Sequence, residues 1–257
     1  MSAELYPILR TQNSKLTIYN SSFIITIMNP FLTISSFNLK IIFGGRFIWF
    51  LLTSFLLYAY FVWNSLWRGE LPTDEMLYSH LFFPALLLVF YPATFGIQND
   101  ADARILEILF GIPGYMYKVW LSRLFLIFVL VFGVLMLYSA ITYFLVFPIS
   151  PLGMSWRLMF PVLFMGCLAF LLSTLTRNGN ATALIIIILG IALIFLRDSF
   201  FKNTMWDISL NPYSLPENIH PVIWESTVLK NRLFLGIGSL VFILLALLNL
   251  QKREKFI

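Results

Sequence analysis

The chain has 257 residues, of which 60% are hydrophobic and 18% aromatic, and only 11% are charged. Soluble domains carry about 25% charged residues, so this composition excludes a soluble protein, and it also excludes disordered, collagen-like and coiled-coil chains. The single cysteine, Cys167, excludes an internal disulfide framework, and a net charge of +5 in so apolar a chain indicates basic flanks of membrane helices rather than a nucleic-acid surface. We therefore predict an all-α integral membrane protein that takes no nucleic acid as a partner.

Residues 1–36 are predicted to form an N-terminal cytoplasmic extension, and residues 37–257 the transmembrane domain. The uncharged stretch 16–39 is long enough to be a seventh span, but it is rich in Asn, Ser and Thr. Polar side chains are costly in lipid, so a position outside the membrane is favoured and spanning is kept as the alternative.

Residues 37–46, which lead into the first span, combine apolar and basic side chains. Apolar residues recur there at i, i+3 and i+4, and the basic residues are Lys40 and Arg46. This pattern is typical of an interfacial helix that lies on the membrane and turns into it at the following Gly pair. An ordinary basic flank is the alternative.

Six transmembrane helices are predicted from the uncharged stretches of the chain. A helix needs about 20 predominantly apolar residues to cross the hydrocarbon core. The spans are expected at about 47–67, 81–97, 121–147, 158–176, 181–196 and 233–251. The connection between the fourth and fifth spans, 176–180, is expected to be tight, and the segment 197–232 before the last span to be long.

The charges of the connecting segments indicate how these spans are oriented in the membrane. With both termini inside, the inner segments hold 11 basic and 5 acidic residues, whereas the outer segments hold 6 basic and 7 acidic. Basic residues are enriched on the cytoplasmic side of membrane proteins. We therefore expect a multi-pass protein of the inner (plasma) membrane with both termini in the cytoplasm.

The sequence carries little that points to catalysis. No Gly is followed by Lys, so the phosphate-binding loop GxxxxGK[ST] is absent, and no Asp, Glu, Lys or Arg lies deep within a predicted span. The two histidines, His80 and His220, fall in different outer segments and are interpreted as interfacial residues. We expect no catalytic residue, no metal site, no cofactor and no enzymatic activity.

The inner segment between the second and third spans is too long for a simple connector. Its aliphatic residues recur at helical spacing on one face, and Asp100, Arg104 and Glu107 lie on the other. That second face is expected to be exposed, with Arg104 paired to Asp100 at i,i+4 and to Glu107 at i,i+3. Asn99 or Asp100 is expected to cap the start of this helix, and Gly111 with the following Pro to end it. The alternative is a helix that merely lies on the membrane.

The order of these elements over residues 28–257 resembles the permease family of type-2 ABC exporters. The most specific part is Asn99–Pro113 (NDADARILEILFGIP), with its acidic run, its Glu within an aliphatic pair and its Pro a few residues on. Ser122-Arg123, at the entry to the third span, is similar to the small-plus-basic pair of that family. The gliding-motility and copper-maturation permeases are the subgroup that the chain resembles.

In that family the cytoplasmic helix couples the permease to a separate nucleotide-binding subunit. The resemblance therefore implies coupling roles for Asp102, Arg104 and Glu107, and Asp100 on the same predicted face is a candidate with them. Arg104 departs from the small residue commonly found near its position, which leaves its contact partner open.

The expected function follows from this resemblance and from the missing nucleotide site. The chain is expected to be the permease subunit of an ATP-driven exporter for an amphipathic, lipidic or peptide-like cargo. Its expected partners are two copies of a P-loop ATPase subunit, a second permease chain, identical or homologous, and membrane lipid. The alternatives are an ion-coupled secondary carrier and a non-transporting membrane scaffold subunit.

Overall fold

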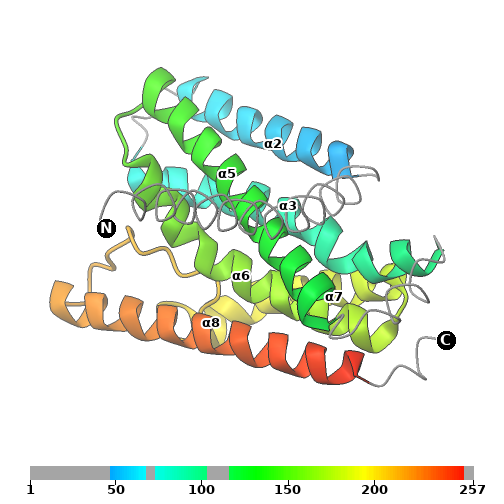
Figure 1. Cartoon of the computed structure of the whole chain (residues 1–257). Coiled ribbons are helices and arrows are strands. Elements are labelled where there is room, and N and C mark those ends of the chain that lie inside the picture. Colours follow the sequence, from blue (N-terminus) through cyan, green and yellow to red (C-terminus); the bar gives the residue numbers. More distant parts are fainter. Residues whose placement is uncertain (1–46, 68–72, 103–115, 252–257) are drawn as a thin grey trace, which may run out of the picture. The chain divides into compact units, whose positions relative to one another are not determined.

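The computed structural model describes residues 47–67, 73–102 and 116–251 (Figure 1). The extension 1–36, the alternative span 16–39 and the predicted interfacial helix with Lys40 and Arg46 lie outside the described residues. Arg104 and Glu107 of the predicted cytoplasmic helix also lie outside them.

The described residues form helices and no strands, with six helices long and apolar enough to cross a membrane. These are α2 (Phe47–Trp67), α3 (Asp74–Asp102), α5 (Ser122–Leu145), α6 (Pro151–Thr176), α7 (Gly179–Leu196) and α8 (Pro221–Leu250). Two short π-helical turns accompany these helices: η1 (Met116–Leu121) precedes α5, and η2 (Arg197–Phe201) follows α7. This content confirms the prediction of an all-helical protein with six apolar helices, as in a multi-pass membrane protein.

Three helices are longer than their predicted spans, and one of them, α6, begins at Pro151 instead of near residue 158. α3 begins at Asp74 and ends at Asp102, and α8 begins at Pro221, where the His220 side chain accepts a hydrogen bond from Val222 N. Charged side chains limited the predicted spans, but a helix continues through charged residues once it has left the hydrocarbon. The long irregular segment is therefore 202–220 rather than 197–232. The tight connection 176–180 is confirmed, because α6 ends at Thr176 and α7 begins at Gly179.

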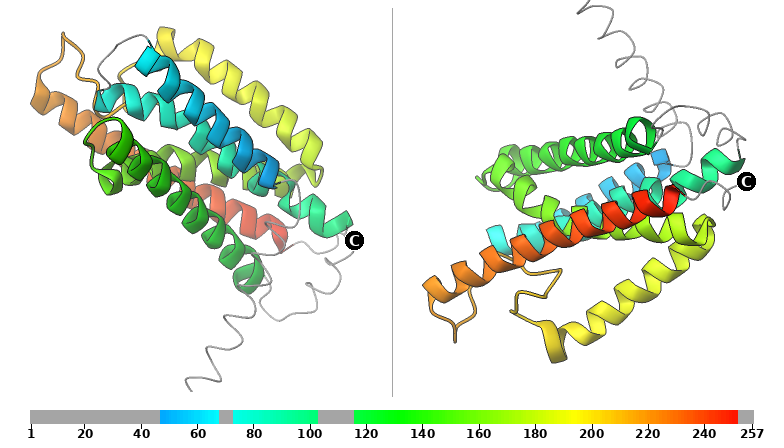
Figure 2. Two further views of the ribbon diagram at one scale, coloured as in Figure 1. Left: turned by 90° about the horizontal axis from the view of Figure 1, so that it is seen from above. Right: turned by 60° about the horizontal axis from the view of Figure 1, so that its bottom comes forward.

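Successive helices run in opposite directions, so each end of the bundle gathers a fixed set of helix termini. The end of α3 lies beside the starts of α5 and α7, as Asp100–Arg123 and Gln98–Gly179 hydrogen bonds show. We call this the Asp100 end. At the opposite end, the start of α3 contacts the segment 202–220, which runs between α7 and α8 (Figure 2). We call this the Tyr213 end.

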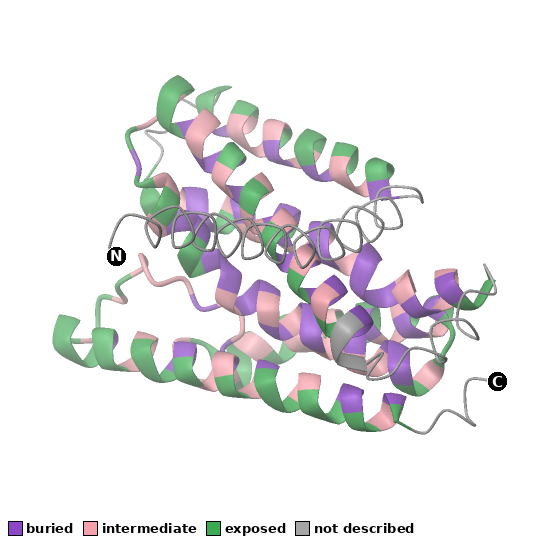
Figure 3. Cartoon of the chain, in the orientation of Figure 1, coloured by how far each residue is buried: buried purple, intermediate pink, exposed green. Residues whose placement is uncertain are grey.

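α3 and α6 are the central helices of this bundle. Within the most apolar 18 residues of each helix, the buried share is 67% in α6 and 61% in α3. The same share is only 17% in α2 and in the helix formed by α7 and η2. Figure 3 shows the contrast, with buried positions along α6 and mainly exposed or half-buried positions along α8. The exposed side chains of the outer helices are large and apolar, which suits contact with lipid.

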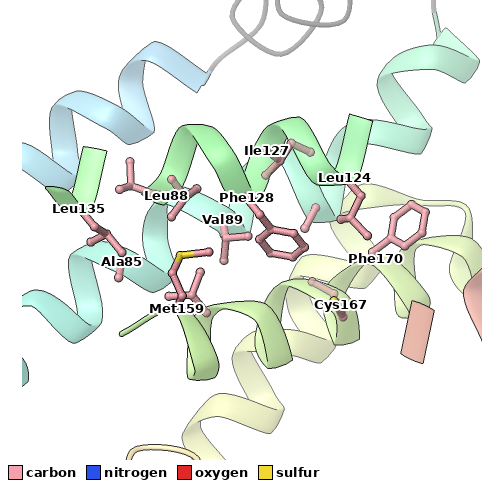
Figure 4. Packing of buried hydrophobic residues seen from close by; sticks show 14 of the residues in the cluster. Ala85, Leu88, Val89, Leu124, Ile127, Phe128, Leu135, Met159, Cys167 and Phe170 are labelled. Carbon is pink, nitrogen blue, oxygen red and sulfur yellow. The ribbon is translucent and has the colours of Figure 1, made fainter. Parts of the chain in front are cut away.

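The core forms where α3, α5 and α6 approach closely. A Cβ at Gly166 of α6 would lie 2.7 Å from Val89 Cγ2 and 2.9 Å from Phe128 Cε1, so only glycine fits this contact. In Figure 4 Val89 and Phe128 lie together near Cys167. Small residues at helix contacts are the usual means of close packing in membranes, where lipid offers no hydrophobic drive for association.

Buried hydroxyl groups connect α2 to α3 and α5. The rings of Tyr58 and Tyr138 stack with centroids 4.8 Å apart, and Tyr58 Oη lies 2.7 Å from Thr142 Oγ1. Tyr138 Oη donates to Ser54 Oγ, which in turn donates to the carbonyl oxygen of Pro84 in α3. Polar atoms between these helices are thus satisfied by one another and not by lipid.

Candidate functional site

An ion pair joins α3 to α5 at the Asp100 end. Arg123 Nη1 donates to Asp100 Oδ2 at 2.6 Å, and the two side chains are 5% and 1% exposed. The Arg123 guanidinium also lies over the Trp120 ring, 4.9 Å from its centroid. Asp100 belongs to the last turn of α3 and Arg123 to the first turn of α5, so the pair fixes together the two helix ends that flank residues 103–115.

The local structure around Asp100 differs from the prediction. Asn99 and Asp100 do not cap a new helix, because α3 continues through both to Asp102, and the exposed position predicted for Asp100 is wrong. Asp102 is exposed and accepts a hydrogen bond from Gln98 Nε2 at 3.4 Å. The coupling roles of Asp100 and Asp102, together with those of Arg104 and Glu107 outside the described residues, stay predictions.

Further hydrogen bonds at the Asp100 end connect α3 to α6 and α7, and α6 to α8. Gly179 N, at the start of α7, donates to Gln98 Oε1 at 2.6 Å. Ser173 Oγ of α6 donates to the carbonyl oxygen of Thr94 in α3. Near the end of α8, Asn249 Nδ2 donates to the carbonyl oxygen of Thr174 at 2.6 Å. The last turns of α3 are therefore hydrogen-bonded to α5, α6 and α7.

At the Tyr213 end, Asn231 of α8 and Asp207 organise the segment 202–220. Asn231 Nδ2 donates to the carbonyl oxygens of Met205 and Asp207, and the Asp207 carboxylate accepts from Arg197 Nε at 3.1 Å. Asn211 Nδ2 donates to the carbonyl oxygen of Glu75 in α3. This segment is therefore folded against the helix starts by specific hydrogen bonds.

Two cavities open at the Tyr213 end. The first, of about 330 Å³, lies between α3, α7 and the segment 202–211, with Tyr78, Phe82, Leu193 and Phe201 among its walls. Its basic residue, Arg197, is paired with Asp207. Both cavities lie within the range of small-molecule sites, about 300–1,000 Å³.

The second cavity, of about 590 Å³, lies between the starts of α6 and α8 and the segment 212–221. We call it the α6/α8 groove. Its walls include Trp156 and Phe160 from α6 and Trp224 from α8, and the basic residues Arg157 and Arg232 line it. Sequence reasoning missed this site, because its two arginines are far apart in the chain and the start of α8 was assigned to an irregular segment.

The histidines and the cysteine have structural contacts. The His80 ring stacks on Phe61 with centroids 5.2 Å apart, and His220 caps α8. Cys167 is buried as a free thiol among apolar side chains. Within the described ranges, no three His, Cys, Asp or Glu side chains are grouped closely enough to hold a metal ion.

No protein-family model, no curated protein and no solved structure matches the chain.

Proposed function

We propose that the chain is the permease subunit of an ATP-driven exporter of the type-2 ABC class. The Asp100 end lies in the cytoplasm of this proposed assembly, and both termini lie on that side of the inner (plasma) membrane. The permease itself is not an enzyme. A separate P-loop ATPase, in two copies, drives it together with a second permease chain, and the cargo is amphipathic, lipidic or peptide-like.

The buried ion pair between Asp100 and Arg123 is the observation that carries this proposal. The segment that resembles a coupling helix connects the end of α3 to η1 and α5. The ion pair joins α3 and α5 directly, on either side of this segment. The pair is buried and only 2.6 Å long, so the end of α3 and the start of α5 are in direct contact. A force applied to residues 103–115 by an ATPase therefore reaches both helices at once.

The contacts of α3 give that force a route into the bundle. α3 is hydrogen-bonded to α6 through Ser173 and to α7 through Gly179, and α6 is the other central helix. A permease that rocks between inward and outward access needs such a connection from its cytoplasmic face to the helices that line the path. The chain has no Gly-Lys dipeptide and so no GxxxxGK[ST] loop, which agrees with ATP hydrolysis by a separate subunit.

The test is hydrolysis and transport by the chain with and without a P-loop subunit. Purified alone in liposomes, the full chain is expected to hydrolyse no ATP. Co-purified with the P-loop ATPase encoded beside it, the complex is expected to hydrolyse ATP, and this activity should depend on an intact Walker lysine of the partner. Sustained hydrolysis by the isolated chain, or no association with any P-loop subunit, would contradict the proposal.

The buried carboxylate of Asp100 is an observation that favours an ion-coupled carrier as the second candidate. Asp100 lies in the last turn of a helix long enough to cross a membrane, and carboxylates enclosed among such helices often carry protons in ion-coupled carriers. In that case a proton or sodium gradient alone would drive transport by the isolated chain, and Asp100→Asn would abolish the dependence on the gradient. The same liposomes, energised by an ion gradient without ATPase, distinguish the two functions.

A further inference from the structure

The α6/α8 groove joins aromatic walls to unsatisfied hydrogen-bond donors. Arg232 is 9% exposed and lies in the fourth turn of α8, where its guanidinium sits over the Phe160 ring, 5.3 Å from the centroid. Its Nη2 donates to Tyr78 Oη at 3.5 Å, whereas the buried Nη1 has no hydrogen-bond partner among the described residues. Trp224 Nε1 is a second buried donor of this groove without a described partner.

The charge of Arg232 is not balanced by a carboxylate at contact distance. Among the described residues, ion pairs within 4.0 Å join Arg123 to Asp100, Arg197 to Asp207 and Lys202 to Asp198, and none includes Arg232. A buried cation is stable when an anion or hydrogen-bond acceptors face it. The groove therefore offers a site for an anion from outside the chain.

Arg157 supplies a second positive charge at the same groove. Its guanidinium lies over the Tyr213 ring at 4.4 Å from the centroid, and its side chain is otherwise exposed. Burial raises the pKa of the Tyr213 hydroxyl, so this group is neutral at pH 7 and leaves the Arg157 charge uncancelled. Glu225 is the one acidic residue that lines the groove, so the two arginines leave a net positive charge there.

The shape and the walls of the groove select an amphiphile over a free anion. Trp156, Trp224 and the exposed Leu229 provide a continuous apolar and aromatic lining beside the arginines. A guanidinium presents a planar fork of N–H donors that matches phosphate or carboxylate oxygens. The first turns of a membrane helix with flanking tryptophans are also where lipid headgroups lie.

We propose that the α6/α8 groove binds one anionic amphiphile, with its phosphate or carboxylate between Arg157 and Arg232. Its hydrocarbon chain lies along Trp156, Trp224 and Leu229. The ligand is either a phospholipid of the surrounding membrane or a single-chain amphiphile that reaches the groove from water. This site stands on the geometry of the groove and does not require that the chain is an exporter.

The experiment measures binding of dodecyl phosphate to the purified full chain in a neutral maltoside detergent by native mass spectrometry. We expect one saturable site, a loss of affinity of at least tenfold in Arg232→Gln, and a smaller loss in Arg157→Gln. Lys230→Gln is the matched control, because Lys230 is exposed on the same helix and does not line the groove. Its affinity should equal that of the unaltered chain.

Two further measurements keep the proposal falsifiable and identify the source of the ligand. If Arg232→Gln does not fold, Arg157→Gln and Trp224→Phe must each weaken binding. Trp224→Phe replaces the indole by a smaller aromatic ring that has no N–H donor. Displacement of the probe by phosphatidylglycerol supports a membrane phospholipid, and resistance to it supports a single-chain amphiphile. Four results would each overturn the proposal. The first two are the absence of a saturable site for the probe and equally tight binding of dodecyltrimethylammonium. The other two are displacement of the probe by equimolar inorganic phosphate and unchanged affinity for it in the arginine variants.

Discussion

Arg123 and Asp100, 23 residues apart in the chain, form the buried ion pair that closes the Asp100 end, with 2.6 Å between Nη1 and Oδ2. Each single substitution, Arg123→Gln or Asp100→Asn, leaves one buried group without its partner and should lower the free energy of unfolding by about 3–5 kcal/mol. The exchange Asp100→Arg with Arg123→Asp should restore much of this loss. Thermal unfolding of the detergent-solubilised protein measures both effects.

The exposed pair Lys202–Asp198 is the control for this prediction. Its nitrogen and oxygen are 3.7 Å apart, and both side chains are more than half exposed. Solvent screens such a pair, so Lys202→Gln should change stability by no more than about 0.5 kcal/mol. Equal effects of Lys202→Gln and Arg123→Gln would show that the buried Asp100–Arg123 pair contributes no more to the free energy of unfolding than an exposed pair does.

The contact of Gly166 with Val89 and Phe128 predicts a steric effect at the centre of the bundle. Gly166→Ala places a Cβ 2.7 Å from Val89 Cγ2 and 2.9 Å from Phe128 Cε1, so these side chains or their helices must shift, at a cost of about 1–3 kcal/mol. Gly133→Ala in α5 is the matched control, because a Cβ there meets no atom within 4 Å. Helix propensity should make the control neutral or slightly stabilising. Unfolding in increasing fractions of denaturing detergent compares the two variants.

The hydroxyl pair of Tyr58 and Thr142 predicts a measurable coupling between α2 and α5. Removing one partner, in Tyr58→Phe or Thr142→Val, breaks the 2.7 Å hydrogen bond. Interhelical hydrogen bonds in membranes contribute about 0.6 kcal/mol on average and at most about 1.7 kcal/mol. A double-mutant cycle on the free energy of unfolding should give a coupling within that range, and a value of zero would contradict a role for this bond in holding α2.

Much of the fold was predictable because charges interrupt the apolar stretches that become helices. The same rule misplaced the starts of α3, α6 and α8, since helical hydrogen bonding continues through charged residues such as Asp74, Arg157 and Arg232 beyond the apolar core. The ion pair of Asp100 with Arg123 was not predictable from local spacing, which favoured Arg104 as the partner. Only the packing of α3 against α5 brings Asp100 and Arg123 together.

The charge asymmetry of the connecting segments predicts which face of the membrane each terminus occupies. In a Cys167→Ser background, cysteines at Ser2 and Ile257 should react with an impermeant thiol reagent only from the cytoplasmic side, and one at Asn218 only from the outside. Asn218 lies in the exposed part of the segment 202–220. Labelling of Ser2 from outside, with Ile257 inside, would instead make 16–39 a seventh span.

Glu107 gives the sharpest test of coupling to an ATPase. If its carboxylate meets a basic group or backbone donors of the partner, that charge-assisted contact is worth roughly 1.5–3 kcal/mol. Glu107→Lys should then weaken co-purification of the ATPase or uncouple hydrolysis from transport, whereas Glu107→Gln, which keeps the shape and one acceptor, should do less harm. A solvated Glu107 paired with Arg104 would contribute only about 0.2–0.5 kcal/mol, and both variants would be nearly silent.

The control for Glu107→Lys is Glu217→Lys, which makes the same change of charge at an exposed position of the Tyr213 end. In the proposed orientation Glu217 faces away from the ATPase, so its variant should assemble and transport like the unaltered chain. Equal loss in both variants would indicate a general effect of charge on insertion or folding. Because Asp100 is held by Arg123 and Glu107 is not part of that pair, Glu107→Lys should leave the thermal stability of the isolated chain unchanged. Loss of assembly without loss of stability is therefore the result that assigns Glu107 to the coupling contact.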